Sequence, residues 1–256
     1  MTTASQHGLP GTRPEGARDE AEAAAQVREM FGRIAPRYDL LNHLMSLDFD
    51  KRWRRRVAKK FSHILHEPRA RVLDLCCGTG DLAFAFRCEA SKGAAIIGSD
   101  FAPEMLVRAR AKAAALGVAV EFVEADALQL PFPDCSFDLV SCAFGFRNLA
   151  NYEHGLREFL RVLKPGGAAG ILEFAEPQGR VFGAAYRFYF RRILPRLGGI
   201  ISGNAAAYAY LPASVSKFPS PEELKLRFEQ AGFMDAEFKR WTGGTVTLHT
   251  GFRQHG

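Results

Sequence analysis

The chain has no long hydrophobic run, although 47% of its 256 residues are hydrophobic. A helix that crosses a membrane needs about 20 consecutive apolar residues, and every apolar stretch here is shorter. The first residues also lack the apolar region of a secretory signal and are rich in Gly, Pro, Ala and charge. We therefore expect a cytoplasmic globular protein whose residues 1–18 form a disordered tail.

Cysteine is scarce and lacks the spacing of a disulfide or zinc framework. The five cysteines are Cys76, Cys77, Cys88, Cys135 and Cys142. Their number is odd, none forms a Cys-x-x-Cys pair, and the adjacent pair suits neither a disulfide nor tetrahedral zinc. The seven histidines are scattered, which gives no convincing metal cluster. We expect buried thiols in a reducing compartment and no metal.

Acidic residues are missing from two basic segments, 51–60 with seven cations and 180–196 with five. The net charge of +6 and this distribution indicate an anionic partner, either nucleic acid or a membrane surface. The second segment also carries an apolar stripe at helical spacing, made of Phe182, Tyr186, Tyr189, Ile193 and Leu197. Such a helix suits a membrane interface or a lid, and it equally suits ordinary packing on the domain.

Short apolar runs alternate with helical stretches after a helical region at 19–61 that is broken near Pro36. The runs are 71–75, 95–100, 120–124, 137–144 and 168–174, with helices expected at 81–88, 103–116 and 152–162. This alternation predicts an α/β, Rossmann-like fold, with a mostly parallel sheet covered by helices on both faces. A helix at 221–231 and runs at 234–240 and 245–250 would add a hairpin and complete seven strands.

The predicted organisation is one domain, 19–256, with an N-terminal helical extension (19–66) and a helical insert (180–219). Its sharpest motif, VLDLCCGTGDLA at 72–83, combines a strand, a glycine turn and the start of a helix. Gly78 and Gly80 let the backbone turn tightly beside a ligand. Asp100, twenty residues after Gly80, ends the next strand and can accept hydrogen bonds from a ribose.

The glycine spacing alone also fits a dinucleotide, so the choice between cofactors depends on the acidic residues around the turn. We expect Asp81 to cap the helix and place negative charge where a pyrophosphate would need the positive helix end. Asp74, at the end of the first strand, adds a second carboxylate. Carboxylates favour the ammonium and sulfonium of S-adenosylmethionine, which carries no phosphate. Asp126 follows the third strand and is either an acceptor for the adenine amino group or a solvated loop acid.

Motifs beyond the glycine turn carry a family resemblance. They are FGRIAPRYD (31–39), LNHLMS (41–46), Trp53, FGFRN (144–148), RVLKPGG (161–167), LEF (172–174) and GGTVTLH (243–249). Over residues 27–251 the chain resembles the ubiquinone/menaquinone biosynthesis C-methyltransferases. The RVLKPGG motif is shared by many methyltransferases, whereas the tyrosine-containing start together with FGFRN is much more specific.

The resemblance implies a class I methyltransferase fold and methylation of a polyprenylated quinol, most simply demethylmenaquinol, with a ubiquinone-pathway benzoquinol as the alternative. It carries the cofactor contacts over to Thr79, Asp100, Asp126 and Ala127. The chain departs from the family at two positions. Ala143 stands where relatives often have a hydroxyl residue, so that contact is lost or falls to Ser141. Asp50 stands where many relatives have histidine.

Methyl transfer to a ring carbon requires a stabilised quinolate that is aligned with the methyl group. Arg147, just beyond the fourth strand, is the first candidate for that role, and a structural salt bridge is its alternative. Tyr38 and Asp39 are candidates for closing the site or accepting a proton, and Tyr38 equally suits packing. His249 is a candidate base, although a lone histidine near a strand end is more often simply hydrogen-bonded.

Two methyltransferase alternatives and one non-enzymatic alternative stay open. A nucleic-acid methyltransferase fits the charge, but N/D-P-P-Y/F and a Pro-Cys nucleophile are absent, so we expect no nucleic-acid partner. A secondary-metabolite methyltransferase would share the cofactor site, and a scaffold in a quinone-synthesis complex would need no active site. The favoured partners are a polyprenyl quinol and, peripherally, an anionic membrane surface; a homo-oligomer is left open.

Overall fold

The structure, a computed structural model, describes residues 11, 12, 14, 16–38, 46, 49–177, 179, 183 and 214–255. Asp39 and the predicted insert from 180 to 213, apart from Gly183, lie outside these residues, and so do the aromatic stripe and the arginines expected there. No helix in the described ranges is long and apolar enough to cross a membrane.

Seven strands form one sheet in the order β3-β2-β1-β4-β5-β7-β6. They are β1 (Arg71–Leu75), β2 (Ala95–Asp100), β3 (Glu121–Glu124), β4 (Phe137–Ala143), β5 (Leu163–Phe174), β6 (Met234–Trp241) and β7 (Val246–Phe252). The first five run parallel, whereas β7 pairs antiparallel with both β5 and β6. The predicted mostly parallel, seven-stranded sheet with a terminal hairpin is confirmed.

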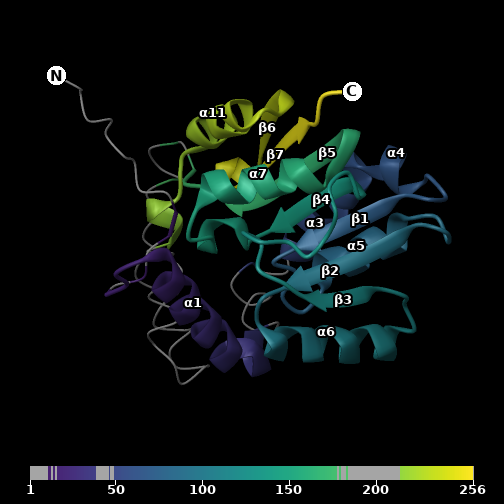
Figure 1. Ribbon diagram of the computed structural model, residues 1–256, viewed down its shortest axis with the longest axis horizontal. Coiled ribbons are helices and arrows are strands. Elements are labelled where there is room, and N and C mark those ends of the chain that lie inside the picture. Colours follow the sequence, from purple (N-terminus) through teal and green to yellow (C-terminus); the bar gives the residue numbers. More distant parts are fainter. Residues whose placement is uncertain are drawn as a thin grey trace.

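Helices cover both faces of the sheet (Figure 1). They are α1 (Glu20–Ile34), η1 (Ala35–Arg37), α3 (Phe49–Lys60), α4 (Ser62–Leu65), α5 (Asp81–Glu89), α6 (Pro103–Leu116), η2 (Phe146–Asn148), α7 (Tyr152–Val162), α11 (Pro221–Ala231) and η4 (Thr242–Gly244). Successive side chains of a strand point to opposite faces. Val72 accordingly packs in the core under α3 and α5, and Leu73 packs in the core under α7 and α11.

Some sequence predictions need correction. β5 begins at Leu163 instead of 168, because the turn at 164–167 stays attached to the sheet through backbone hydrogen bonds to Arg253. Thr12, inside the segment expected to be a disordered tail, is buried, and its N–H donates to the Leu149 carbonyl at 2.8 Å. All five cysteines are free thiols, but Cys88 and Cys135 are exposed, so the prediction of burial is wrong for these two.

The carboxyl ends of the parallel strands meet at one edge, and α1 lies across that edge (Figure 1). Arg28 of α1 pairs with Glu124 at the end of β3 at 2.6 Å. The Asn151 amide, which precedes α7, donates to Glu20 at 3.1 Å. These two contacts anchor the first residue and the middle of α1 over the edge where ligands bind in open α/β sheets.

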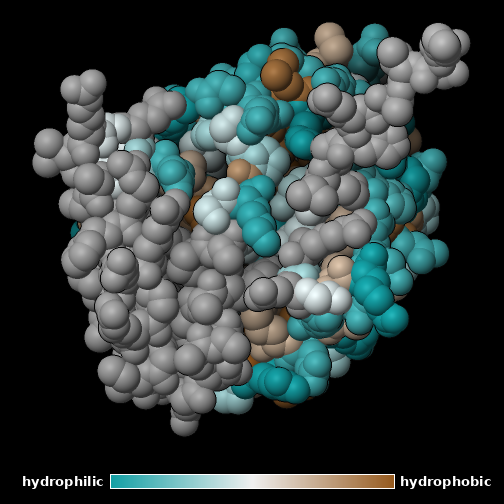
Figure 2. Space-filling model, turned by 90° about the vertical axis from the view of Figure 1, so that its left-hand side faces the viewer, coloured by the Kyte–Doolittle hydropathy of each residue, from teal (hydrophilic) through white to brown (hydrophobic). Residues whose placement is uncertain are grey.

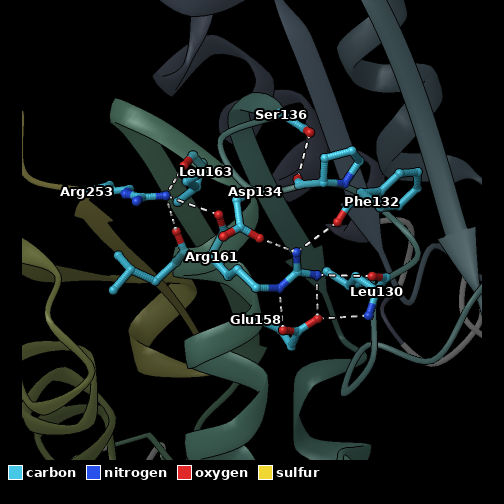
Figure 3. A network of polar contacts seen from close by, with 10 residues as sticks. Leu130, Phe132, Asp134, Ser136, Glu158, Arg161, Leu163 and Arg253 are labelled. Atoms are coloured by element: carbon cyan, nitrogen blue, oxygen red, sulfur yellow. Dashed lines mark hydrogen bonds and ion pairs between the residues drawn. The ribbon is translucent and has the colours of Figure 1, made fainter. Parts of the chain in front are cut away.

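A polar network fixes the loop that joins β3 to β4 (Figure 3). The Arg161 guanidinium donates to the carbonyl oxygens of Leu130 and Phe132 at 3.0 and 2.8 Å and pairs with Glu158 at 2.7 Å. Glu158 in turn accepts the Leu130 N–H at 2.8 Å, and the hydrogen bond from Arg161 lowers the pKa of the Glu158 carboxyl. The loop starts at Asp126, so this network holds one wall of the site described next.

Candidate active site

A pocket that is partly open to solvent lies at the carboxyl edge of the sheet; we call it the main pocket. Ligands bind at this edge in open α/β sheets. It is lined by residues of α1 and of the segments that follow β1, β2, β3 and β4: Ala24, Phe31, Tyr38, Cys76, Gly78, Ser99, Asp100, Phe101, Met105, Ala125, Asp126, Ala127, Leu128, Phe144, Gly145, Asn148, Leu149 and Ala150. Figure 2 faces this side of the molecule, where hydrophobic and hydrophilic residues are intermixed.

Asp100 presents a buried carboxylate to the main pocket. One oxygen accepts the Gly78 N–H at 2.8 Å and the other accepts the Ala102 N–H at 2.9 Å. Burial raises the pKa of Asp100 to about 6, against the opposing effect of these backbone donors. Each oxygen keeps acceptor capacity beyond its single bond, so the carboxylate can receive ribose hydroxyls as the sequence predicted. Ser99 Oγ, buried beside it, has no hydrogen-bond partner in the described residues.

The glycine turn adopts the conformation that the motif requires. Gly78 and Gly80 have φ values of +55° and +89°, in the left-handed region that glycine adopts at little cost. Gly78 lines the main pocket, whereas Gly80 precedes α5 and faces the rings of Phe84 and Phe122. Gly78 is therefore placed to approach a ligand, and Gly80 shapes the turn behind it.

Asp126 and Ala127 form the wall after β3 and line the main pocket. One Asp126 oxygen accepts the Leu128 N–H at 2.8 Å, which closes a tight turn. Ala127 is only 6% exposed. The turn thus holds the exposed Asp126 side chain at the rim of the main pocket, a position that suits an acceptor of an amino group and a solvated loop acid alike.

A second, smaller pocket lies directly beside the first, and Tyr38 and Cys76 line both. We call it the small pocket; it is completed by Arg54, Asp74, Cys77, Thr79, Asp81, Leu82 and Ala143. Asp74 is 1% exposed, and neither carboxylate oxygen has a hydrogen-bond partner within the described residues. Burial raises the pKa of the Asp74 carboxyl well above its usual range, an effect that the charge of Arg54 and the nearby Ala83 N–H, which is outside hydrogen-bond geometry, oppose only in part.

A buried carboxylate without a partner is costly unless a ligand completes it. An ammonium group is the natural complement, because it donates three hydrogen bonds and cancels the charge. The small pocket therefore fits the amino-acid part of S-adenosylmethionine, and the main pocket fits the nucleoside part. The residues present are consistent with the cofactor that the sequence predicts.

Asp81 plays a different part from the predicted one. The N-cap of α5 is Gly80, and no side chain caps this helix. The Asp81 carboxylate instead pairs with Lys112 of α6 at 2.5 Å and lies 3.7 Å from the Arg54 guanidinium. Lys112 also donates to Thr79 Oγ1 at 3.2 Å. Asp81 thus ties α3 and α6 to the glycine turn.

An aromatic wall lies where β4 and β5 end, and Phe144 of this wall lines the main pocket. The Phe144 and Phe174 ring centroids are 4.5 Å apart, and Trp53 of α3 lies 5.9 Å from Phe144. Phe144 has a φ of +61°, which is strained for a bulky residue. At the neighbouring Gly145, an added Cβ would lie 2.3 Å from the Cys76 Cβ, so only glycine fits this close approach.

Arg147 lies behind this wall and does not line either pocket. It forms a buried ion pair with Glu173 at 2.9 Å, donates to the Phe144 carbonyl, and has Ser214 Oγ 3.3 Å from Nε. Its charge is thus already matched, which favours the structural salt bridge over direct contact with a quinolate. Holding the carbonyl of Phe144 helps to maintain the strained backbone of that residue.

Three other predicted residues are also placed by the structure. Tyr38 lines both pockets, and an added Cβ at Gly78 would lie 3.5 Å from its ring. Ser141 is fully buried in β4, donates to the Gly170 carbonyl at 2.9 Å and lines neither pocket. His249 is buried between α11 and β6, where Nε2 lies 2.9 Å from the Pro221 carbonyl, so it is outside the pockets as well.

Several lining residues of the main pocket were not predicted from the sequence. Ser99 and Phe101 flank Asp100, and Asn148 follows Arg147, so proximity to the motifs was the available signal. Arg54 was counted only within the basic run 51–60. Its burial, with a side chain 9% exposed, singles it out from the exposed Arg52, Arg55 and Arg56.

Comparison with known proteins agrees with this geometry. Residues 18–253 match the model of the ubiE/COQ5 methyltransferase family. The chain is 53% identical over 224 residues to the demethylmenaquinone methyltransferase of Thermus thermophilus, covering 88% of this chain and 100% of the relative. For the same enzyme of Deinococcus radiodurans the identity is 51% over 233 residues, covering 91% and 95%.

The ubiquinone/menaquinone biosynthesis C-methyltransferase of Geobacter sulfurreducens is 44% identical over 234 residues, covering 90% of this chain and 89% of the relative. Among solved structures, a SAM-dependent methyltransferase from Thermotoga maritima has a TM-score of 0.62 at 18% identity, covering 88% and 99%. One from Aquifex aeolicus has a TM-score of 0.56 at 21% identity, covering 78% and 88%; these two similarities concern the fold alone. The chain belongs to the ubiE/COQ5 methyltransferase family and is an S-adenosylmethionine-dependent methyltransferase.

Proposed function

We propose that this enzyme methylates a ring carbon of demethylmenaquinol to form menaquinol. The observation that carries the proposal is the junction of the two pockets, where acids suited to the cofactor meet an aromatic wall suited to a fused ring. The two relatives at 53% and 51% identity are both named demethylmenaquinone methyltransferases, which favours the naphthoquinol over a benzoquinol.

In this proposal Asp100 accepts the ribose hydroxyls, Asp126 accepts the adenine amino group and Asp74 accepts the ammonium. The cofactor supplies an electrophilic methyl group on its sulfonium. Phe144 and the rest of the aromatic wall hold the quinol ring flat and exclude water, which strengthens electrostatic interactions in the site. Tyr38, at the junction of the pockets, donates a hydrogen bond from its hydroxyl to the quinolate oxygen. Arg147 acts indirectly, because it holds the backbone of Phe144 in place.

The test compares two substrates in separate reactions. The purified enzyme is incubated with labelled methyl donor and chemically reduced demethylmenaquinone, or with the matching ubiquinone-pathway benzoquinol, each with a short prenyl tail. Mass spectrometry should find the added methyl group on the naphthoquinol ring, with a kcat/KM well above that of the benzoquinol. Preference for the benzoquinol would support the alternative that the relative from Geobacter sulfurreducens suggests, and methylation of neither would refute both.

We also propose that the enzyme works peripherally on an anionic membrane, where a polyprenyl substrate resides. The outer face of α3 supports this, because the helix carries six exposed cations: Lys51, Arg52, Arg55, Arg56, Lys59 and Lys60, the last of which pairs with Glu237. Near anionic lipid each basic residue contributes about 1 kcal/mol, screened by salt. The segment 180–196, which lies outside the described residues apart from Gly183, holds five further cations in the sequence.

Vesicle sedimentation tests this surface. Changing Arg52, Arg55 and Lys59 to Glu should abolish salt-sensitive binding to phosphatidylglycerol vesicles and slow turnover of long-tailed quinols. The same charge change at the exposed Arg69, Lys92 and Arg108 is the matched control and should leave most binding intact. Equal losses in both triple variants would show that net charge alone, and not α3, governs binding.

A further inference from the structure

Arg54 is the one buried arginine of α3, a helix whose other arginines are exposed. We propose that its guanidinium binds the carboxylate of the amino-acid part of S-adenosylmethionine in the small pocket. This role is independent of which quinol accepts the methyl group, so it stands or falls apart from the proposed substrate.

The contacts of Arg54 leave donors available. Within the described residues only Nη1 is engaged; it bonds Asp50 and lies 3.7 Å from Asp81. A guanidinium has five N–H donors in a planar fork that matches a carboxylate. The guanidinium carbon Cζ lies over the Phe144 ring, 5.6 Å from its centroid. Nε and Nη2 therefore remain for a ligand in the pocket that Arg54 lines.

Other cations are less suitable for this carboxylate. Lys112 reaches the same region, but its ammonium already bonds Asp81 and Thr79 and does not line the small pocket. In this arrangement Asp74, near the carboxyl end of β1, binds the ammonium of the ligand. The amino acid would thus be held between one unpartnered carboxylate and one partly engaged guanidinium, which fixes both of its charged groups.

The charges of this region fit the methyl donor better than its product. Three carboxylates, those of Asp50, Asp74 and Asp81, face two cations, Arg54 and Lys112. S-adenosylmethionine carries one carboxylate, one ammonium and one sulfonium, so its net positive charge offsets part of the acidic charge of the site, to which Asp100 adds a further carboxylate. After methyl transfer the sulfonium charge is gone, which weakens the attraction between the product and these acids and favours its release.

Ligand truncation tests the role directly. Isothermal calorimetry compares S-adenosylmethionine with decarboxylated S-adenosylmethionine, which lacks only the carboxylate, and with 5′-methylthioadenosine, which lacks the whole amino acid. Charge-assisted hydrogen bonds should give the wild type about a 10- to 100-fold preference for the carboxylated ligand. Arg54→Met should remove that preference while binding methylthioadenosine normally. Arg55→Met, one position along the same helix and exposed, should retain it.

An Arg54→Met protein that keeps the wild-type preference would overturn the proposal and leave Arg54 only the task of neutralising Asp50 and Asp81. Retained methylthioadenosine binding shows that the variant is folded. If that binding is lost, the comparison moves to Arg54→Lys, which keeps the charge but not the planar fork. A preference reduced several-fold in Arg54→Lys supports the proposal, and an unchanged preference refutes it.

Discussion

Replacing Glu173 by Gln would test whether the buried ion pair with Arg147 supports the aromatic wall of the site. The Glu173 side chain is 0% exposed, the Arg147 side chain is 6% exposed, and the pair spans 2.9 Å. Gln keeps the shape of the side chain but leaves the guanidinium charge buried without its counter-charge. Removing one partner of a buried pair costs about 3–5 kcal/mol.

That free energy translates into a large shift in melting temperature. Unfolding entropy is about 2.1 cal/mol/K per residue, so a chain of this length loses roughly 2 °C of Tm per kcal/mol. We therefore expect Glu173→Gln to melt about 6–10 °C below the wild type. The control is Glu29→Gln, which breaks the exposed pair with Arg33, whose side chains are 64% and 66% exposed. Exposed pairs contribute about 0–1 kcal/mol, so this variant should shift by about 2 °C or less.

Differential scanning calorimetry at pH 7.5 measures both variants, and binding of S-adenosylmethionine reports whether the pocket survives. A loss of stability in Glu173→Gln with weakened aromatic packing in the near-ultraviolet circular dichroism would agree with a clamp on Phe144. Two variants that melt within 2 °C of each other would refute the reasoning, because the buried charge would then carry no special cost.

Three further predictions concern the cofactor, metals and pH. Asp100→Ala should weaken S-adenosylmethionine binding by about 1.5–3 kcal/mol, because a charge-assisted acceptor is lost; unchanged affinity in a folded variant would remove Asp100 from the site. Methyl transfer should survive exhaustive chelation, since the sulfonium supplies the electrophile, and activity restored by one divalent ion would contradict this. Burial lowers the pKa of His249 from 6.5 to about 4, so its neutral form stabilises the fold above pH 6.5, and this contribution is lost as the pH falls towards 4. Urea unfolding measures the free energy of unfolding of the wild type and of His249→Gln. The difference between the two should therefore shrink as the pH falls, and a difference that stays constant would show that protonation of His249 does not affect stability.

Much of the fold was predictable because it depends on local patterns. The strands at 71–75 and 95–100 and the helices at 103–116, 152–162 and 221–231 agree with the structure at both ends. Apolar runs of strand length, Pro at helix starts and Gly at helix ends are all signals within a few residues. The start of β5 at Leu163 was missed because its bonds to Arg253 connect residues about ninety positions apart, which no local pattern records.

The positions of the three candidate cofactor acids were predictable for a topological reason. Asp74 is the last but one residue of β1, Asp100 ends β2 and Asp126 follows β3, and parallel strands bring their carboxyl ends to one edge. The role of Arg147 was harder to predict, because its partner Glu173 lies 26 positions away on the neighbouring strand. From the sequence alone, a free guanidinium and a paired one look identical. Direct catalytic assignment of a single arginine therefore needs the packing around it.

The helix α3 shows, for a whole segment, the same limit of prediction from sequence. Its seven cations read as one basic run in the sequence, yet helical periodicity divides them by burial. Trp53 and Val57 turn inward with Arg54, so that guanidinium enters the small pocket, while Arg52, Arg55 and Lys59 turn outward. A buried cation is tolerated only with counter-charges, and Asp50 and Asp81 provide them. The exposed cations have a different consequence, since they attract anionic surfaces through the solvent. If both proposals hold, one charge run serves two partners, the cofactor on its inner face and an anionic lipid on its outer face.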